Sequence, residues 1–152
     1  MGAAFFYHLS ERPLEATLPI LLGKALGAGW RVAVRGTDTQ RLERLDQHLW
    51  QGDGFLPHGL AGGPHDAEQP VLLTTDKASN GATCVMSVDG AEVSPEEIAA
   101  LARVCILFDG ADESAVEHAR GQWRAVSEAG LAAEYWAEEG GSWVKKATSD
   151  AA

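Results

Sequence analysis

The first fifty residues alternate between two hydrophobic patterns, and this alternation is the strongest constraint on the fold. Residues 3–9 (AAFFYHL) form an apolar, aromatic-rich run typical of a buried strand. Apolar side chains then recur along one helical face, at Leu14, Leu18, Leu21, Leu22 and Ala25. A second strand is predicted at residues 30–35 (WRVAVR), and a second helix follows it, marked by Leu42, Leu45 and Leu49. Strand–helix–strand–helix order predicts an α/β protein with a parallel sheet and crossover helices.

The first predicted helix contains prolines and is followed by glycines. Pro13 suits its first turn, where the missing N–H has no helical partner in any case. Pro19 lies further along the same apolar pattern, so it predicts either a later helix start or a kink. Gly27 and Gly29 are typical of a helix end.

A long segment in the middle of the chain is rich in turn-forming residues. Residues 51–70 (QGDGFLPHGLAGGPHDAEQP) predict a loop. Loops of this length inside a compact domain are uncommon and are usually functional or mobile. The residues before the loop are too few to complete a core of their own, so we place no domain boundary here.

Strands and helices alternate again after the loop. Strands are predicted at residues 71–74, 82–88, 103–108 and 131–136. A capping-box pattern predicts a short helix, with Ser94, Pro95 and Glu97. A longer helix is predicted over residues 112–129, with an inner face made of Val116, Ala119, Trp123 and Val126. We expect a polar tail that frays after Trp143.

The length of 152 residues indicates one domain. We place this domain at residues 1–147 and treat residues 148–152 as a frayed tail. The N-terminal run MGAAFFYHL is neither a signal peptide nor a membrane span, which needs about 20 apolar residues. Cys84 and Cys105 lie in apolar runs and are predicted to be buried free thiols. These features predict a cytoplasmic protein.

The net charge of −10 disfavours direct binding to nucleic acid, because an acidic surface repels phosphate. Between Asp89 and Trp143 there are twelve acidic residues and only three basic ones, Arg103, Arg120 and Arg124. The last two are four residues apart, on one face of the predicted helix. Their neighbours Glu117 and Glu128 are spaced to pair with them, so a solvated, salt-bridged face is one interpretation and a binding site is the other.

The sequence lacks the motifs of common α/β enzymes. It has no phosphate-binding loop, no glycine-rich dinucleotide motif after a strand, and no nucleophile elbow. No cofactor is therefore predicted.

The histidines offer one enzymatic alternative. His58 and His65 lie seven residues apart in the predicted loop, near Asp66, and we interpret them as exposed side chains that hold no metal. A small nucleotide-dependent or hydrolytic enzyme with a site in loop 51–66, built from these residues, is the alternative function. His8 lies in the first predicted strand and is interpreted as a core histidine with a hydrogen-bond partner.

Several aromatic residues occur where a core does not require them. Trp50 ends the second predicted helix, and Phe55 lies in the following Gly/Pro-rich segment. They either fill the local core or serve as anchors for a partner, since aromatic residues dominate interface hot spots. Trp123 lies between the two arginines at positions 120 and 124.

Taken in order, several short motifs resemble the chi subunit of bacterial DNA polymerase III, an accessory subunit of the clamp-loader complex. The matching pieces are Phe5-Phe6-Tyr7-x-Leu9, Lys24-Ala25, Gly29-x-Arg31-Val32, Leu45-Asp46-x-x-Leu49-Trp50, Phe55-Leu56-Pro57-His58, Gln69-Pro70-Val71, Phe108-Asp109 and Ala119-Arg120-x-x-Trp123-Arg124. The resemblance spans about residues 4–147. Its most specific part is the joint order of D-x-x-L-W, F-L-P-H, Q-P-V and A-R-x-x-W.

The resemblance implies a three-layer α/β/α fold with a mostly parallel central sheet, Rossmann-like but without a phosphate loop. It also implies a non-catalytic adaptor in DNA replication with two protein partners. One is the small psi subunit, which tethers chi to the clamp loader. The other is the acidic, phenylalanine-ended C-terminal tail of single-stranded DNA-binding protein (SSB). Some chi proteins also partner a helicase through the psi-side surface, and no direct binding to DNA or membranes is implied.

Matched residue by residue, the resemblance assigns Trp50 and Phe55 to the psi side, with Leu56 and Pro57 beside them. It assigns the SSB tail to Arg120, Trp123 and Arg124, with Val116 where some members carry another basic residue. Guanidinium groups suit the carboxylates of such a tail, and an apolar slot beside an indole suits its terminal phenylalanine. A plain structural module without tail affinity is the remaining alternative.

Overall fold

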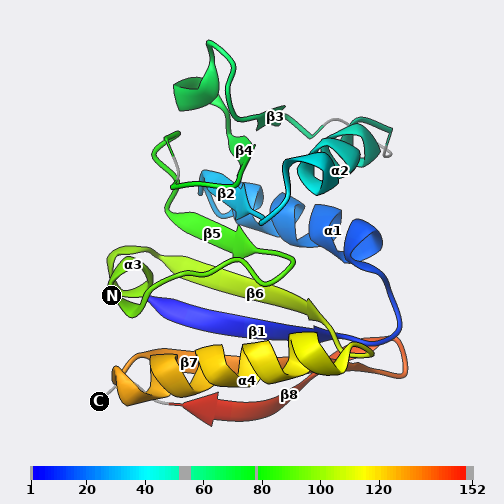
Figure 1. Cartoon of the computed structure of the whole chain (residues 1–152), viewed down its shortest axis with the longest axis vertical. Helices are drawn as coiled ribbons and strands as arrows, with labels where there is room; N and C mark the ends of the chain where they lie inside the picture. Colours follow the sequence, from blue (N-terminus) through cyan, green and yellow to red (C-terminus); the bar gives the residue numbers. More distant parts are fainter. Residues whose placement is uncertain (1, 52–55, 78, 150–152) are drawn as a thin grey trace.

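The computed structural model describes residues 2–51, 56–77 and 79–149. Its strands are β1 (Ala3–Leu9), β2 (Val32–Arg35), β3 (Gly59–Leu60), β4 (Val71–Thr74), β5 (Cys84–Ser87), β6 (Arg103–Asp109), β7 (Ala132–Glu139) and β8 (Ser142–Ser149). Its helices are α1 (Leu14–Gly27), α2 (Thr39–Gln51), α3 (Pro95–Ala100), α4 (Glu113–Glu128) and the short 3₁₀ helix Asp66–Glu68. The strands form one eight-stranded sheet in the order β3-β4-β2-β5-β6-β1-β7-β8 (Figure 1).

The predicted architecture is confirmed. All neighbouring strands pair in parallel except β8, which pairs antiparallel with β7. α1 and α2 pack on one face of the sheet, and α3 and α4 pack on the other, which makes three layers. Figure 1 shows α2 near one end of the sheet and α4 lying along β1 and β7 near the other end. Among the described residues, no helix is both long and apolar enough to cross a membrane.

The three strands β2, β4 and β5 have every residue buried. A strand covered on both faces cannot alternate between apolar and polar residues, which is why these strands are short continuous apolar runs. Cys84 on β5 and Cys105 on β6 are buried free thiols, as predicted. The pKa of Cys105 is raised, first by its hydrogen bond with Cys84 and then by burial.

The helix boundaries agree with the capping signals. Ser94 and Glu97 form the predicted capping box of α3. α1 begins at Leu14 directly after Pro13, so a later start is wrong, and Pro19 lies inside the helix. The predicted loop 51–70 is wrong in part, because its described portion contains the edge strand β3 and the 3₁₀ helix.

The expectation that the tail frays after Trp143 is wrong, because residues 142–149 form strand β8. Gly140 and Gly141 have positive φ angles of 59° and 80°, the backbone of a two-residue hairpin turn. Glu139 pairs with Ser142 across this turn. β8 is an edge strand that is mostly exposed and contains two lysines, so it lacks the apolar alternation by which a strand is recognised.

A buried carboxylate ties β7 to the loop after β1. Glu138 is only 6% exposed. Its Oε1 accepts the backbone N–H groups of Ser10, Glu11 and Arg12, at 3.2, 3.3 and 3.3 Å. A buried charge needs such partners, because an unpaired one is strongly destabilising. The hairpin of β7 and β8 is therefore fixed relative to β1.

An ion pair joins the carboxyl end of β2 to α3. Arg35 donates from Nη1 to Oε1 of Glu97 at 3.1 Å and from Nη2 to Oε2 at 2.9 Å. Arg35 is only 7% exposed, so its charge depends on this partner. The hydrogen bond from Arg35 lowers the pKa of Glu97.

We predict that Glu97→Gln lowers the free energy of unfolding by about 1–3 kcal/mol, because glutamine keeps the capping box but leaves the guanidinium without its counter-charge. The exposed neighbour provides the control Glu96→Gln, which should change stability by less than about 0.5 kcal/mol. The folded-state pKa of Glu97 lies below its ordinary value of 4.5. The difference should therefore be full at pH 7 and shrink as the pH falls through the lowered pKa. Urea melts at pH 7 and pH 3 test this, and equal effects of the two substitutions would contradict it.

Candidate functional site

α4 carries the two predicted arginines on its outer surface. Asp112 caps this helix and accepts the N–H of Ser114 at 3.0 Å. Ala119 and Val126 are buried against the sheet, while Arg120 and Arg124 are exposed. The partly buried ring of Trp123 contacts the Phe6 ring edge-on, with centroids 5.3 Å apart. A core contact thus holds the indole between two exposed cations.

The hairpin of β7 and β8 supplies the second wall of a hollow beside α4, which we call the α4–hairpin hollow. It has a volume of about 450 Å³ and is lined by Arg120, Trp123, Arg124, Tyr135, Lys146 and Ala147. The rings of Trp123 and Tyr135 lie 6.0 Å apart and are inclined at 77°, so they form a corner. An aromatic side chain of a ligand can pack edge-to-face in such a corner.

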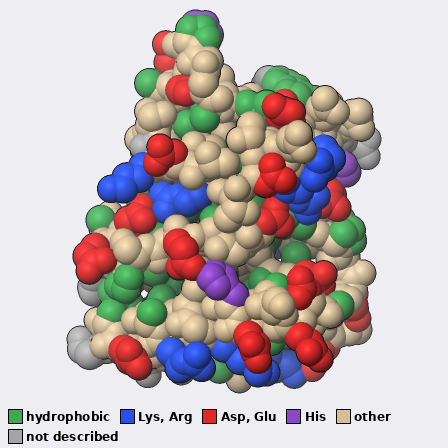
Figure 2. Space-filling view, viewed as in Figure 1, with side chains coloured by type: hydrophobic (Ala, Val, Ile, Leu, Met, Phe, Trp, Pro, Cys, Tyr) green, Lys and Arg blue, Asp and Glu red, His purple; other side chains and the backbone are tan. Residues whose placement is uncertain are grey.

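Three basic side chains line the hollow although the protein is acidic. Figure 2 shows Lys and Arg side chains among Asp and Glu side chains along the lower edge of the molecule, where Figure 1 places α4 and β8. Among the described residues, neither Arg120 nor Arg124 forms a salt bridge, whereas Lys146 pairs with Glu139. The salt-bridged interpretation of the arginine pair is therefore wrong. Burial raises the pKa of Tyr135 even though Arg120 opposes this shift, so the phenol stays neutral. The arrangement can bind a carboxylate whose neighbouring apolar side chain enters the corner.

The predicted tail-site residues do not all lie together. Arg120, Trp123 and Arg124 share the hollow, but Val116 does not line it and packs instead against the α4-side core. Sequence reasoning did not assign Tyr135, Lys146 or Ala147 to the tail site. Tyr135 lies in the strand predicted at residues 131–136, without a predicted role in the site, whereas Lys146 and Ala147 lie on β8, which was not predicted. The Gly140–Gly141 pair is the sequence signal that could have indicated this hairpin. The neighbouring Lys145 lies elsewhere, over the ring of Trp136.

Trp50 marks a second candidate surface, at the last turn of α2. It is 54% exposed, so it does not fill the core. Its ring lies against that of His58, with centroids 4.2 Å apart and ring planes inclined at 37°. Leu56 and Pro57 are partly buried beside His58, and Leu56 packs against the α1-side core. The predicted site residue Phe55 lies outside the described residues.

The expectation of an exposed His58 is wrong, because only 4% of this residue is exposed. Its Nδ1 lies 2.6 Å from the carbonyl oxygen of Leu56, and its Nε2 lies 3.1 Å from that of Asp46. The contact with Asp46 anchors the segment after residue 55 to α2, with Trp50 covering the ring. Sequence analysis missed this anchoring role of His58, because a contact between distant residues leaves no local pattern in a Gly/Pro-rich segment. His65 is exposed as expected and lies 3.6 Å from Glu68.

His58, His65 and Asp66, the residues of the alternative enzyme site, each contact a different partner. His58 bonds to α2, His65 lies beside Glu68, and the Asp66 carboxylate accepts the N–H groups of Gly62 and Gly63. In the part of the chain that the structure describes, no three His, Cys, Asp or Glu side chains are placed to hold a metal. The geometry therefore gives no support to a site in this segment.

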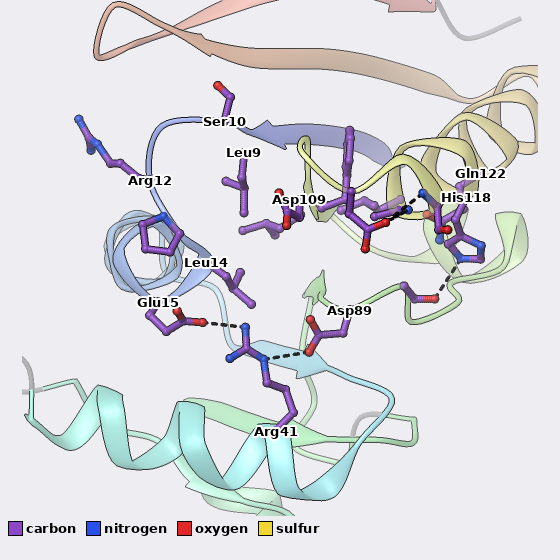
Figure 3. Close-up of a pocket in the computed structure, with 18 of the residues that line it drawn as sticks. Leu9, Ser10, Arg12, Leu14, Glu15, Arg41, Asp89, Asp109, His118 and Gln122 are labelled. Atoms are coloured by element: carbon purple, nitrogen blue, oxygen red, sulfur yellow. Dashed lines mark hydrogen bonds and ion pairs between the residues drawn. The ribbon is translucent and has the colours of Figure 1, made fainter.

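A larger cavity of about 850 Å³ lies at the carboxyl ends of β1, β5 and β6. Open α/β folds bind ligands at such positions. Figure 3 shows Arg41 reaching between Glu15 at 2.7 Å and Asp89 at 3.2 Å. The other carboxylates of the lining accept backbone N–H groups, as seen for Glu11, Asp109 and Asp112. An acidic lining without a glycine-rich loop is unsuited to phosphate, so the cavity lacks the features of a nucleotide site.

Two comparisons with known proteins agree on the family. The model of the family described as "DNA polymerase III chi subunit, HolC" matches residues 1–134. A curated relative, "Probable DNA polymerase III subunit chi" from Rickettsia prowazekii (strain Madrid E), is 26% identical over 100 residues. The match covers 64% of this chain and 58% of the relative's length.

We predict that His58→Ala lowers the free energy of unfolding by about 1–3 kcal/mol, because it removes a buried ring and its hydrogen-bonding contact with α2. His65→Ala is the matched control from the same segment and should change stability by less than about 0.5 kcal/mol. Urea denaturation followed by tryptophan fluorescence measures both. A similar effect of the two substitutions would show that the His58 anchor does not stabilise the fold.

Proposed function

The chain belongs to the DNA polymerase III chi subunit family, and from this premise we propose that it is a non-catalytic adaptor between two other replication proteins. Its family makes it an accessory subunit in DNA replication. We propose that the α4–hairpin hollow binds the acidic, phenylalanine-ended C-terminal tail of SSB. We further propose that the surface around Trp50 binds the psi subunit of the clamp loader.

The arginine pair is the observation that carries the tail assignment. Two guanidinium groups, which form no salt bridge within the described part of the chain, flank an aromatic corner on a protein whose net charge is −10. Carboxylates of a tail suit the arginines and Lys146, and a terminal phenyl ring suits the corner between Trp123 and Tyr135. One short peptide end can therefore satisfy both parts of the hollow.

The affinity follows from opposing contributions. A bond between a guanidinium group and a carboxylate stabilises the complex by about 1.5–3 kcal/mol. Burial of a phenyl side chain adds roughly 1.5–3 kcal/mol. Ordering a flexible tail opposes these gains, and the acidic protein repels the tail at long range. We therefore expect weak binding, with a dissociation constant on the order of micromolar.

The psi assignment rests on the exposure of Trp50. Truncating an aromatic hot spot typically weakens an interface by about 2 kcal/mol or more. The His58 anchor holds the backbone beside Trp50 in place, so Leu56 and Pro57 can add to a preformed surface. Phe55 is proposed as the second anchor.

The two proposed surfaces lie toward opposite ends of the sheet. α2 packs on β3 and β4, whereas the hollow is formed by α4, β7 and β8. Five strand spacings of about 4.8 Å separate β4 from β7, which places the surfaces roughly 25 Å apart. Both partners can therefore bind at once, as an adaptor requires.

We predict that Arg120→Ala and Arg124→Ala each weaken binding of an acidic, phenylalanine-ended SSB tail peptide by about tenfold or more. Arg→Lys should restore binding only in part, because lysine lacks the planar fork. Arg44→Ala, at an exposed arginine on α2, is the matched control and should bind normally. Calorimetry at low and high salt measures the affinities, with weaker binding at high salt. Unchanged affinity in both alanine variants would place the site elsewhere.

We predict that Trp50→Ala or Phe55→Ala weakens psi binding by about thirtyfold, the equivalent of a 2 kcal/mol hot spot. Both variants should keep their affinity for the SSB tail. Gln47→Ala, an exposed position on the same helix, should bind psi normally. Loss of cooperative melting in Trp50→Ala would instead show that this side chain stabilises the core, and it would contradict the assignment of Trp50 to a binding surface.

A further inference from the structure

His8 contacts the α4–hairpin hollow from behind without lining it. It lies on β1, directly beside β7 in the sheet. Its Nδ1 is 2.8 Å from the Tyr135 hydroxyl, and Tyr135 is one wall of the hollow. In the neutral ring with its hydrogen on Nε2, Nδ1 accepts the hydrogen bond that the phenol donates. His8 therefore has the predicted hydrogen-bond partner, although it is only partly buried, and this partner belongs to the candidate site.

The His8 ring is held in one position by its surroundings. It contacts the Phe108 ring edge-on, with centroids 5.3 Å apart. On its other side lies Gly110, where an added Cβ would be only 2.0 Å from Nε2 of His8. The ring thus occupies the space that a side chain at position 110 would need. This packing makes Nδ1 a fixed acceptor for Tyr135.

The other described contacts of the Tyr135 ring are apolar, because it packs against the α4-side core. Trp123 and Phe108 contact it at centroid distances of 6.0 and 5.9 Å. Ring contacts of this kind tolerate sliding and tilting, whereas a hydrogen bond at the end of the ring fixes its direction. The 77° corner between Trp123 and Tyr135 therefore depends on the acceptor behind it.

We propose that His8 is a positioning residue that sets the selectivity of the hollow for a peptide end with an aromatic side chain. This inference rests on the function proposed above and adds a specificity-determining residue to it. His8 acts only through the Tyr135 ring, so it should affect recognition of the terminal phenyl group. It should leave the contacts between the arginines and carboxylates unchanged.

The test compares two acidic peptides that differ only in their last residue, phenylalanine or alanine. For the wild type, we expect tighter binding of the phenylalanine peptide. His8→Ala should reduce affinity for that peptide about fivefold, as the loss of one hydrogen bond implies, and leave the alanine peptide unaffected. Tyr135→Phe keeps the ring but removes the donor, and it should reproduce this loss. The double variant should be no worse than either single variant.

Two further variants separate positioning from general stability. His8→Asn places an amide oxygen near the former Nδ1 and should recover most of the selectivity. His65→Ala, at an exposed histidine outside the hollow, should behave as wild type. If His8→Ala fails to fold, the affinities of Tyr135→Phe for the two peptides test the inference on their own.

The results separate a failure of the proposed tail binding from a failure of the His8 role alone. No binding of either peptide to the wild type would overturn the proposed function and the inference with it. Wild-type selectivity that persists in both His8→Ala and Tyr135→Phe would overturn the inference alone. Equal loss of both peptides in these variants would also overturn it, since it would mean that the whole hollow had collapsed.

Discussion

The parallel pairing of β7 with β1 is the contact on which the candidate tail site depends. This register places Tyr135 opposite Phe6 and Ala137 opposite His8. Side chains paired in this way point to the same face of the sheet, the face that α4 covers. A slip of one residue would turn Tyr135 to the opposite face, and the hollow would lose a wall. The three N–H groups bound by Glu138 hold β7 against the loop after β1 and oppose such a slip.

The whole surface and the α4–hairpin hollow differ in charge. A net charge of −10 repels phosphate at long range. In the function we propose, recognition in the α4–hairpin hollow relies instead on short-range bonds from Arg120 and Arg124, beside a packed aromatic corner. In the proposed function, the protein contacts SSB and not the DNA that SSB covers, and this acidic surface suits such an indirect role.

The sequence predicted the features that have a local cause. The apolar runs gave the buried strands, Ser94 and Asp112 marked helix starts, and the spacing of Arg120 and Arg124 placed them together. It did not predict β8, because an exposed edge strand with lysines lacks the alternation of a half-buried strand. It also missed the roles of His58 and Tyr135. Their partners, Asp46 and His8, lie 12 and 127 residues away in the chain, and contacts at that separation leave no periodic signal.

The adaptor role is tested most directly by asking whether both partners bind at the same time. The measurement is the affinity of the SSB tail peptide for the free protein and for its complex with psi, with the mass of the assembly followed by sedimentation. Because the surfaces lie on different elements toward opposite ends of the sheet, we predict one complex that contains all three components. The tail affinity should change by less than about threefold, as expected for independent sites. Displacement of psi by the tail, or of the tail by psi, would contradict the account.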